Sequence, residues 1–164
     1  ARFDRETPDL ELVELPVGPW MKDISRKAGK TSAHIRIQCH VPEPDQEYKI
    51  LAEPRYMSRA LSNLVQNAVK YAATRVDIRF EKTGCDCMIH VEDDGPGIPK
   101  SDYKRIFDAF VRLDSSRSRD TGGYGMGLAI VKRIVEWHGG DVIVSKSLHG
   151  GAKFTIRWKA DKGR

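Results

Sequence analysis

Residues 91–99 read VEDDGPGIP and place two carboxylates, Asp93 and Asp94, directly before a Gly-Pro-Gly turn. Adjacent acids of this kind are compatible with a metal site, an acid–base pair or a solvated turn. The flanking glycines, Gly95 and Gly97, have no side chain and would let a flat ligand approach the backbone closely.

The segment before this turn distinguishes the two acids. Residues 87–93 alternate like a β-strand, which puts Asp93 on the same face as Ile89 and Val91. Because those two apolar side chains should face the core, we expect Asp93 at the core's edge beside a cavity, and Asp94 facing solvent. An ionised carboxylate in such a place is a hydrogen-bond acceptor, for which an exocyclic amine is a natural partner.

A second group of polar residues lies on the helix predicted over residues 53–73. Asn63, Asn67 and Lys70 are spaced i, i+4, i+7 and share one stripe, with Tyr71 between that stripe and the apolar face. An Asn oxygen is a hard ligand suited to Mg²⁺, and a Lys can meet a phosphate as a point charge. The alternative is an amide pair that bonds neighbouring backbone.

The stretch GGYGMGLAIV, residues 122–131, combines three alternating glycines with the start of an amphipathic helix. Gly123, Gly125 and Gly127 allow a close backbone approach, and a helix start suits phosphate. It is not the dinucleotide pattern, because Leu128 occupies the third glycine position. A flexible turn before a core helix is the alternative interpretation.

The bulk composition is that of one globular domain. The chain has 164 residues, 40% of them hydrophobic and 31% charged, and no apolar run long enough to span a membrane. A net charge of +5 comes from scattered basic residues, so we expect no nucleic-acid partner. Three cysteines form no disulfide framework and indicate reduced thiols.

Periodicity and turn residues predict the elements that position these groups. We expect strands over 10–15, 33–41, 48–52, 75–81, 87–93, 141–147 and 152–158, and helices over 19–29, 53–73 and 126–140, with a short helix starting near residue 101 and a loop over 111–123. This order predicts an α+β two-layer sandwich, with helices on one face of a mixed, largely antiparallel sheet.

Four segments occur together in one order: NLVQNAVKYA, VEDDGPGI, IFDAFVRLD and GGYGMGLAIV. This set resembles the N, G1, F and G2 boxes of the catalytic, ATP-binding domain of bacterial sensor histidine kinases. The resemblance runs from about Arg59 to Gly140, and the four boxes in order are far more specific than any one. It implies the Bergerat, or GHKL, fold shared with the gyrase, Hsp90 and MutL ATPases.

The resemblance also implies ATP and Mg²⁺ as ligands and gives each polar residue a role. Asn67 is similar to the family's Mg²⁺ ligand, with Asn63 beside it. Lys70 corresponds to the lysine that reaches the phosphates, and Tyr71 to the aromatic residue that packs on adenine. Asp93 corresponds to the aspartate that accepts a hydrogen bond from the adenine amino group, a recognition residue and not a general acid or base.

The remaining implied site residues lie in loops and at a helix start. Gly95, Gly97 and Ile98 are expected to line the adenine pocket. The ATP lid and the helix start near the phosphates are expected to include Gly123, Gly125, Gly127 and Leu128. Among the lid arginines Arg112, Arg117 and Arg119, one is expected to meet the γ-phosphate; with Lys70, Arg117 and Arg119 are the candidate catalytic residues.

One position separates branches of this fold. In the gyrase, Hsp90 and MutL type, a Glu four residues before the Mg²⁺-binding Asn activates water. Here that position is Asn63, which cannot usefully accept a proton at neutral pH. The sequence therefore favours a site that holds ATP without hydrolysing it quickly. The alternatives are an ATPase of the MutL or gyrase type and a nucleotide-binding regulatory module that transfers nothing.

No histidine of the chain stands in the acceptor motif H-[ED]-[LIV] of the family. The residues after His34, His40, His90, His138 and His149 are Ile, Val, Val, Gly and Gly. We therefore expect the acceptor on a helical dimerisation domain outside this chain, which would also be the route to a response regulator.

The expected domain organisation follows from that absence. Residues 1–8 would be the end of the helical domain or a linker, 9–160 the ATP-binding domain and 161–164 a tail. Without the helical domain we expect a monomer. The fragment is expected to be the cytoplasmic part of an inner-membrane sensor kinase and not itself in the membrane.

Overall fold

A five-stranded mixed sheet forms one layer of the molecule. The computed structural model describes residues 7–41, 48–108 and 127–159. The strand order is β2-β4-β5-β7-β6, with β2 parallel to β4 and the other pairs antiparallel. The bounds are β2 Arg36–His40, β4 Arg75–Thr83, β5 Asp86–Asp93, β6 Asp141–Lys146 and β7 Ala152–Lys159.

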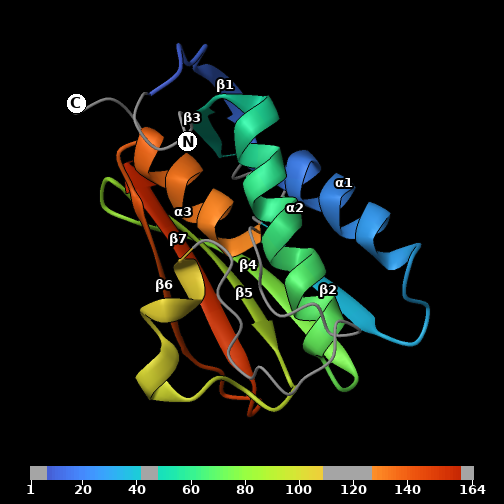
Figure 1. The fold of residues 1–164 in the computed structure, drawn as a ribbon. Coiled ribbons are helices and arrows are strands. Elements are labelled where there is room, and N and C mark those ends of the chain that lie inside the picture. The colour runs from blue at the N-terminus through green and yellow to red at the C-terminus, as the bar shows by residue number, and fades with distance from the viewer. Residues whose placement is uncertain (1–6, 42–47, 109–126, 160–164) are drawn as a thin grey trace.

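Three helices form the second layer and cover one face of this sheet (Figure 1). They are α1 Val17–Gly29, α2 Pro54–Tyr71 and α3 Gly127–Trp137. Strands β1 Val13–Pro16 and β3 Lys49–Ala52 pair antiparallel as a separate two-stranded sheet, which the strand pattern did not separate from the main one. The predicted α+β two-layer sandwich is confirmed.

Helix α2 shows how local sequence fixes an element. The Glu53 side chain caps its start by accepting from the Arg55 N–H, and Pro54 at the first position needs no donor of its own. Its apolar stripe is at most 1% exposed and consists of Met57, Ala60, Leu61, Leu64, Val65 and Ala68. Burying that stripe turns the polar stripe of α2 away from the core.

Several predicted elements differ from the structure: β1 begins at Val13 instead of residue 10, and α3 ends at Trp137 instead of residue 140. Helix α1 begins at Val17, two residues before the expected Pro19. Pro19 is tolerated inside the first turn because N–H groups there have no partner within the helix. The Val17 N–H instead donates to the Tyr48 carbonyl at 3.0 Å. The short helix expected near Ser101 is instead two 3₁₀ turns, Lys100–Asp102 and Arg105–Phe107. The second turn buries Phe107 against the core.

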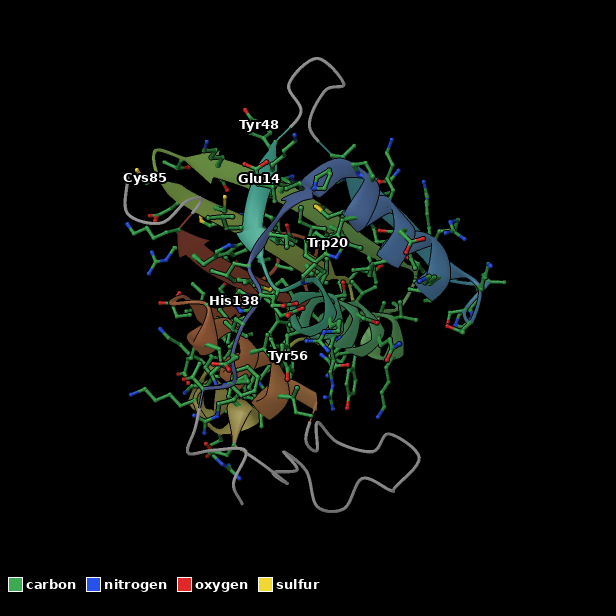
Figure 2. All side chains as sticks on the ribbon, turned by 90° about the horizontal axis from the view of Figure 1, so that it is seen from above. Glu14, Trp20, Tyr48, Tyr56, Cys85 and His138 are labelled. Carbon is green, nitrogen blue, oxygen red and sulfur yellow. The ribbon has the colours of Figure 1, made fainter. Side chains whose placement is uncertain are left out.

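The helices are joined at the end of the molecule seen in Figure 2, where Trp20, Tyr56 and His138 come from α1, α2 and the residue after α3. The Trp20 indole donates to Ser58 at 2.8 Å, and the Tyr56 ring packs edge-on against Trp137. The His138 Nε2 lies 3.1 Å from the Glu53 backbone N–H. These contacts fix the start of α2 relative to its neighbours.

At the opposite end of α2, the residues that end β5 and follow it approach both the last residue of the helix and the turn between β6 and β7. Gly151 of that turn is so close to β5 that an added Cβ would lie 2.1 Å from Asp93 Oδ1 and 2.4 Å from the Asp93 carbonyl oxygen. At Gly95 a Cβ would lie 2.1 Å from the carbonyl oxygen of Tyr71, the last residue of α2. Two glycines thus let three elements meet at the end of β5.

We expect Gly151→Ala to destabilise the domain by about 1–3 kcal/mol, since its methyl group would meet two atoms of buried Asp93 and the backbone nitrogen of Gly95. The measurement is thermal or urea unfolding. Gly29→Ala is the matched control, because an added Cβ there meets nothing within 4 Å. Equal unfolding midpoints for the two variants would show that the turn can move away without cost.

Candidate functional site

The polar stripe of α2 faces the start of α3. The Asn63 side-chain nitrogen donates to the Gly127 carbonyl oxygen at 3.4 Å, which joins two predicted site residues 64 positions apart. Asn63 is half-buried. Its amide bonds the backbone of a neighbouring element, which agrees with the alternative interpretation of this residue. That contact places the first turn of α3 beside the middle of α2 (Figure 1).

The rest of the stripe lies nearer the solvent. Asn67 is half-buried, and its amide makes no hydrogen bond to another residue in the part of the chain that the structure describes. Lys70 is exposed, with its Nζ 5.6 Å from the centroid of the half-buried Tyr71 ring. An amide oxygen, an ammonium group and an aromatic face are thus presented along one side of α2.

Asp93 is the buried carboxylate of the site, with 3% of its surface exposed. Its Oδ1 accepts from the backbone N–H of Gly95 at 2.8 Å and of Ala152 at 3.4 Å. No described residue donates to its Oδ2. Burial raises the pKa of Asp93, against the effect of the two N–H donors. One oxygen is therefore held by the backbone, while the other remains an acceptor.

Strand alternation predicted that Asp94 faces solvent, whereas in the structure its carboxylate is bonded to the turn after α2. It is half-buried, and its Oδ1 accepts from the backbone N–H groups of Ala73, Thr74 and Arg75 at 2.9–3.1 Å. Burial opposes ionisation, but the Thr74 hydroxyl and those N–H groups outweigh it and hold the Asp94 pKa well below its usual range. Asp94 thus fastens the turn after α2, next to Tyr71.

The loop after β5 returns toward the same place. Gly97 has a φ of +80°, a conformation that suits glycine, and an added Cβ there would lie 3.2 Å from the Gly150 carbonyl oxygen. Ile98 is half-buried and packs against the core. Sequence reasoning missed Gly151, which packs on Asp93; the glycine pair directly before a predicted strand was the signal that could have indicated it.

The remaining predicted residues fall into two groups. Gly127 is half-buried at the start of α3, with open space where a side chain would be, whereas Leu128 is 1% exposed and belongs to the hydrophobic core. Burial leaves little of the Leu128 side chain for a ligand. Outside the described residues lie Arg112, Arg117, Arg119, Gly123 and Gly125, together with the predicted loop.

Two kinds of feature are absent from residues 7–41, 48–108 and 127–159. No group of three or more His, Cys, Asp or Glu side chains there could hold a metal ion. None of the helices in these ranges has the length and the hydropathy of a membrane-spanning segment.

Comparisons with known proteins match this arrangement. Residues 52–162 match the family described as "Histidine kinase-, DNA gyrase B-, and HSP90-like ATPase". The chain is 38% identical over 166 residues to the sensor protein RstB of Escherichia coli K12, with 96% of this chain and 36% of RstB covered. It is 36% identical over 113 residues to the sensor histidine kinase CpxA of the same strain, covering 69% of this chain and 25% of CpxA.

Solved structures agree. Full-length ShkA in complex with AMPPNP superposes with a TM-score of 0.84 at 28% identity, covering 99% of this chain and 34% of ShkA. The mycobacterial sensor histidine kinase MprB gives a TM-score of 0.77 at 26% identity, covering 91% of this chain and 97% of that one. The chain therefore belongs to the histidine kinase-, DNA gyrase B- and HSP90-like ATPase family, and it is a catalytic ATP-binding domain of the sensor histidine kinase type.

Proposed function

We propose that this domain holds ATP, with Mg²⁺, for transfer of the γ-phosphoryl group to a histidine of a helical dimerisation domain. The observation that carries the proposal is the Asp93 carboxylate. Backbone donors hold its Oδ1, and Oδ2 is left to accept from the 6-amino group of adenine. This buried acceptor, beside Gly95 and Gly97, supports recognition of an adenine base.

The side of α2 suits the rest of the nucleotide. Tyr71 would pack on the base, and Lys70 would meet a phosphate through a charge-assisted contact. The residues present fit Mg²⁺: Mg²⁺ takes oxygen ligands and keeps several from water and phosphate, so the amide oxygen of Asn67 suffices from the protein. Bound there, the ion would neutralise phosphate charge during transfer.

The same stripe disfavours rapid hydrolysis. At position 63 an amide bonds the Gly127 carbonyl, and an amide cannot remove a proton from water. Phosphoryl transfer depends mainly on positioning and charge neutralisation, which this site can supply without a base of its own. An ATPase of the gyrase or MutL type is therefore the less favoured candidate.

The whole protein's activity extends this proposal beyond the chain. We infer a histidine protein kinase in which this domain acts in the cytoplasm, beside a helical phosphoacceptor domain that passes phosphate to a response regulator. Support comes from the named relatives, which are sensor kinases longer than this chain. None of the five histidines has the acceptor motif. Arg117 or Arg119 would neutralise charge on the γ-phosphate.

Asp93→Asn should weaken ATP binding by about 1–3 kcal/mol and reverse the preference for ATP over ITP. The side-chain oxygen of an Asn can still accept from the two backbone N–H groups that bond Asp93 Oδ1. Its NH₂ group then takes the place of Oδ2, the oxygen proposed to accept from adenine. That group opposes the adenine amino group but can donate to the 6-oxo group of inosine. Calorimetric titration with both nucleotides measures the effect.

The matched control is Asp86→Asn, the same change at the other end of β5. If Asp93→Asn and Asp86→Asn bind ATP equally well, Asp93 does not recognise the base. A loss of both nucleotides in equal measure by Asp93→Asn would point to misfolding instead, which circular dichroism would detect.

Asn67→Ala should lower nucleotide affinity mainly when Mg²⁺ is present. The reason is that its amide oxygen is the proposed metal ligand, whereas the base and Lys70 contacts remain. Titration of an ATP analogue with Mg²⁺ and with a chelator measures the difference. Gln66→Ala, one residue earlier on the exposed face of α2, is the control. Equal losses with and without Mg²⁺ would exclude Asn67 as a ligand.

The chain alone should bind ATP without acquiring stable phosphate, and a helical phosphoacceptor fragment mixed with it should become labelled slowly. Untethered fragments lose the high effective concentration of a joined acceptor, so the rate should rise with fragment concentration. Radiolabelled ATP with each fragment alone and with both provides the measurement. Stoichiometric histidine label on this chain alone would contradict the proposal, as would rapid phosphate release without labelling.

A further inference from the structure

The turn between β6 and β7, residues 147–151, packs directly against Asp93. Gly151 is in contact with the Asp93 side chain and backbone, and the next N–H, of Ala152, donates to Asp93 Oδ1. The Gly150 carbonyl oxygen lies against Gly97. The position of this turn therefore determines how the carboxylate is held.

Ser147 closes the turn. Its N–H donates to the Gly151 carbonyl at 2.8 Å, and its carbonyl accepts from the Gly150 N–H at 3.1 Å. Its hydroxyl accepts from the His149 N–H at 3.0 Å and donates to Glu92 Oε1 at 2.8 Å. All four of these bonds involve one residue that is 3% exposed.

Glu92, which accepts the hydrogen bond from the Ser147 hydroxyl, is itself held in place. It is 4% exposed and lies on β5 directly before Asp93, on the opposite face of the sheet. Its Oε2 is 3.4 Å from an Arg79 guanidinium nitrogen. The turn is thus held from both faces of the sheet by consecutive residues of one strand: Glu92 bonds Ser147, and Asp93 contacts Gly151.

Apolar packing does not hold this turn. Its large apolar side chain, Leu148, is 96% exposed, and His149 reaches the buried Asp77 carboxylate only through a partly exposed contact of 3.4 Å. The buried bond between Ser147 and Glu92 is therefore the main side-chain restraint on the turn in the described structure.

We propose that Ser147 and Glu92 are positioning residues for nucleotide recognition: their hydrogen bond fixes the turn so that the Ala152 N–H keeps Asp93 Oδ1 occupied and Oδ2 accepts from the base. The proposal rests on the adenine role of Asp93. Neither residue would touch the nucleotide. Loss of their bond should reduce selectivity for the amino group of adenine and leave the phosphate contacts of α2 intact.

Ser147→Ala tests this in calorimetric titrations with ATP and with ITP. We expect ATP binding about fivefold weaker, the size expected for loss of one net hydrogen bond, and little change for ITP, so the ratio of affinities falls. Ser147→Thr keeps the hydroxyl and should restore the ratio. Glu92→Gln keeps an oxygen for Ser147 and should also stay near the wild-type ratio, because the bond matters and the charge does not.

Ser145→Ala is the matched control. It makes the same change two residues earlier on β6, where the hydroxyl has no hydrogen-bond partner among the described residues. If the wild type prefers ATP, an unchanged ATP to ITP ratio in Ser147→Ala would overturn the proposal, as would equal losses of both nucleotides. Failure of the threonine variant to restore the ratio would also count against it.

A measurement without nucleotide separates this proposal from the adenine role itself. The Ala152 N–H lowers the Asp93 pKa, so displacing the turn in Ser147→Ala should raise the pKa seen in an NMR titration of the Asp93 carboxyl and shift the Ala152 amide signal. Unchanged values would overturn the positioning claim. If these signals move but wild-type protein shows no preference for ATP over ITP, the positioning holds and the base assignment fails.

Discussion

Three consecutive carboxylates at the end of β5 hold the site together, each through a different neighbour. Glu92 bonds the β6–β7 turn, Asp93 accepts from the backbone N–H groups of Gly95 and Ala152, and Asp94 accepts from the N–H groups of the turn after α2. Like charges this close repel one another, so each needs its own donors. The strand end is therefore the common anchor of helix α2, the glycine loop and the last hairpin.

The opposite pKa shifts of the two aspartates follow from this arrangement. Asp94 gains several donors at the surface, so ionisation is favoured and its carboxylate is a structural acceptor. Asp93 is buried with fewer donors, so its ionised form is costlier and its second oxygen remains available. A group with unused acceptor capacity in a buried place is suited to recognise a ligand, because a matching donor gains most there.

Much of the fold followed from local sequence. The α2 stripe, the hairpin of β4 and β5 and the final hairpin have clear periodicity, and each was predicted within a few residues. Short segments were less predictable. The segment around Ser101 forms 3₁₀ turns because its few apolar residues bury Phe107 without completing a helical face. Pairing of β1 with β3 depended on residues distant in sequence.

The sequence by itself determined which side chains share a face, because residue type and spacing put Asn63 and Asn67 on one stripe and Asp93 on the core face. Only the tertiary structure decided what each group bonds. It assigned Asp94 to the turn after α2 and brought Gly151 against Asp93, since both contacts join segments about 20 to 60 residues apart. Periodicity reports which way a side chain points along its own element, whereas its partner depends on how distant elements pack.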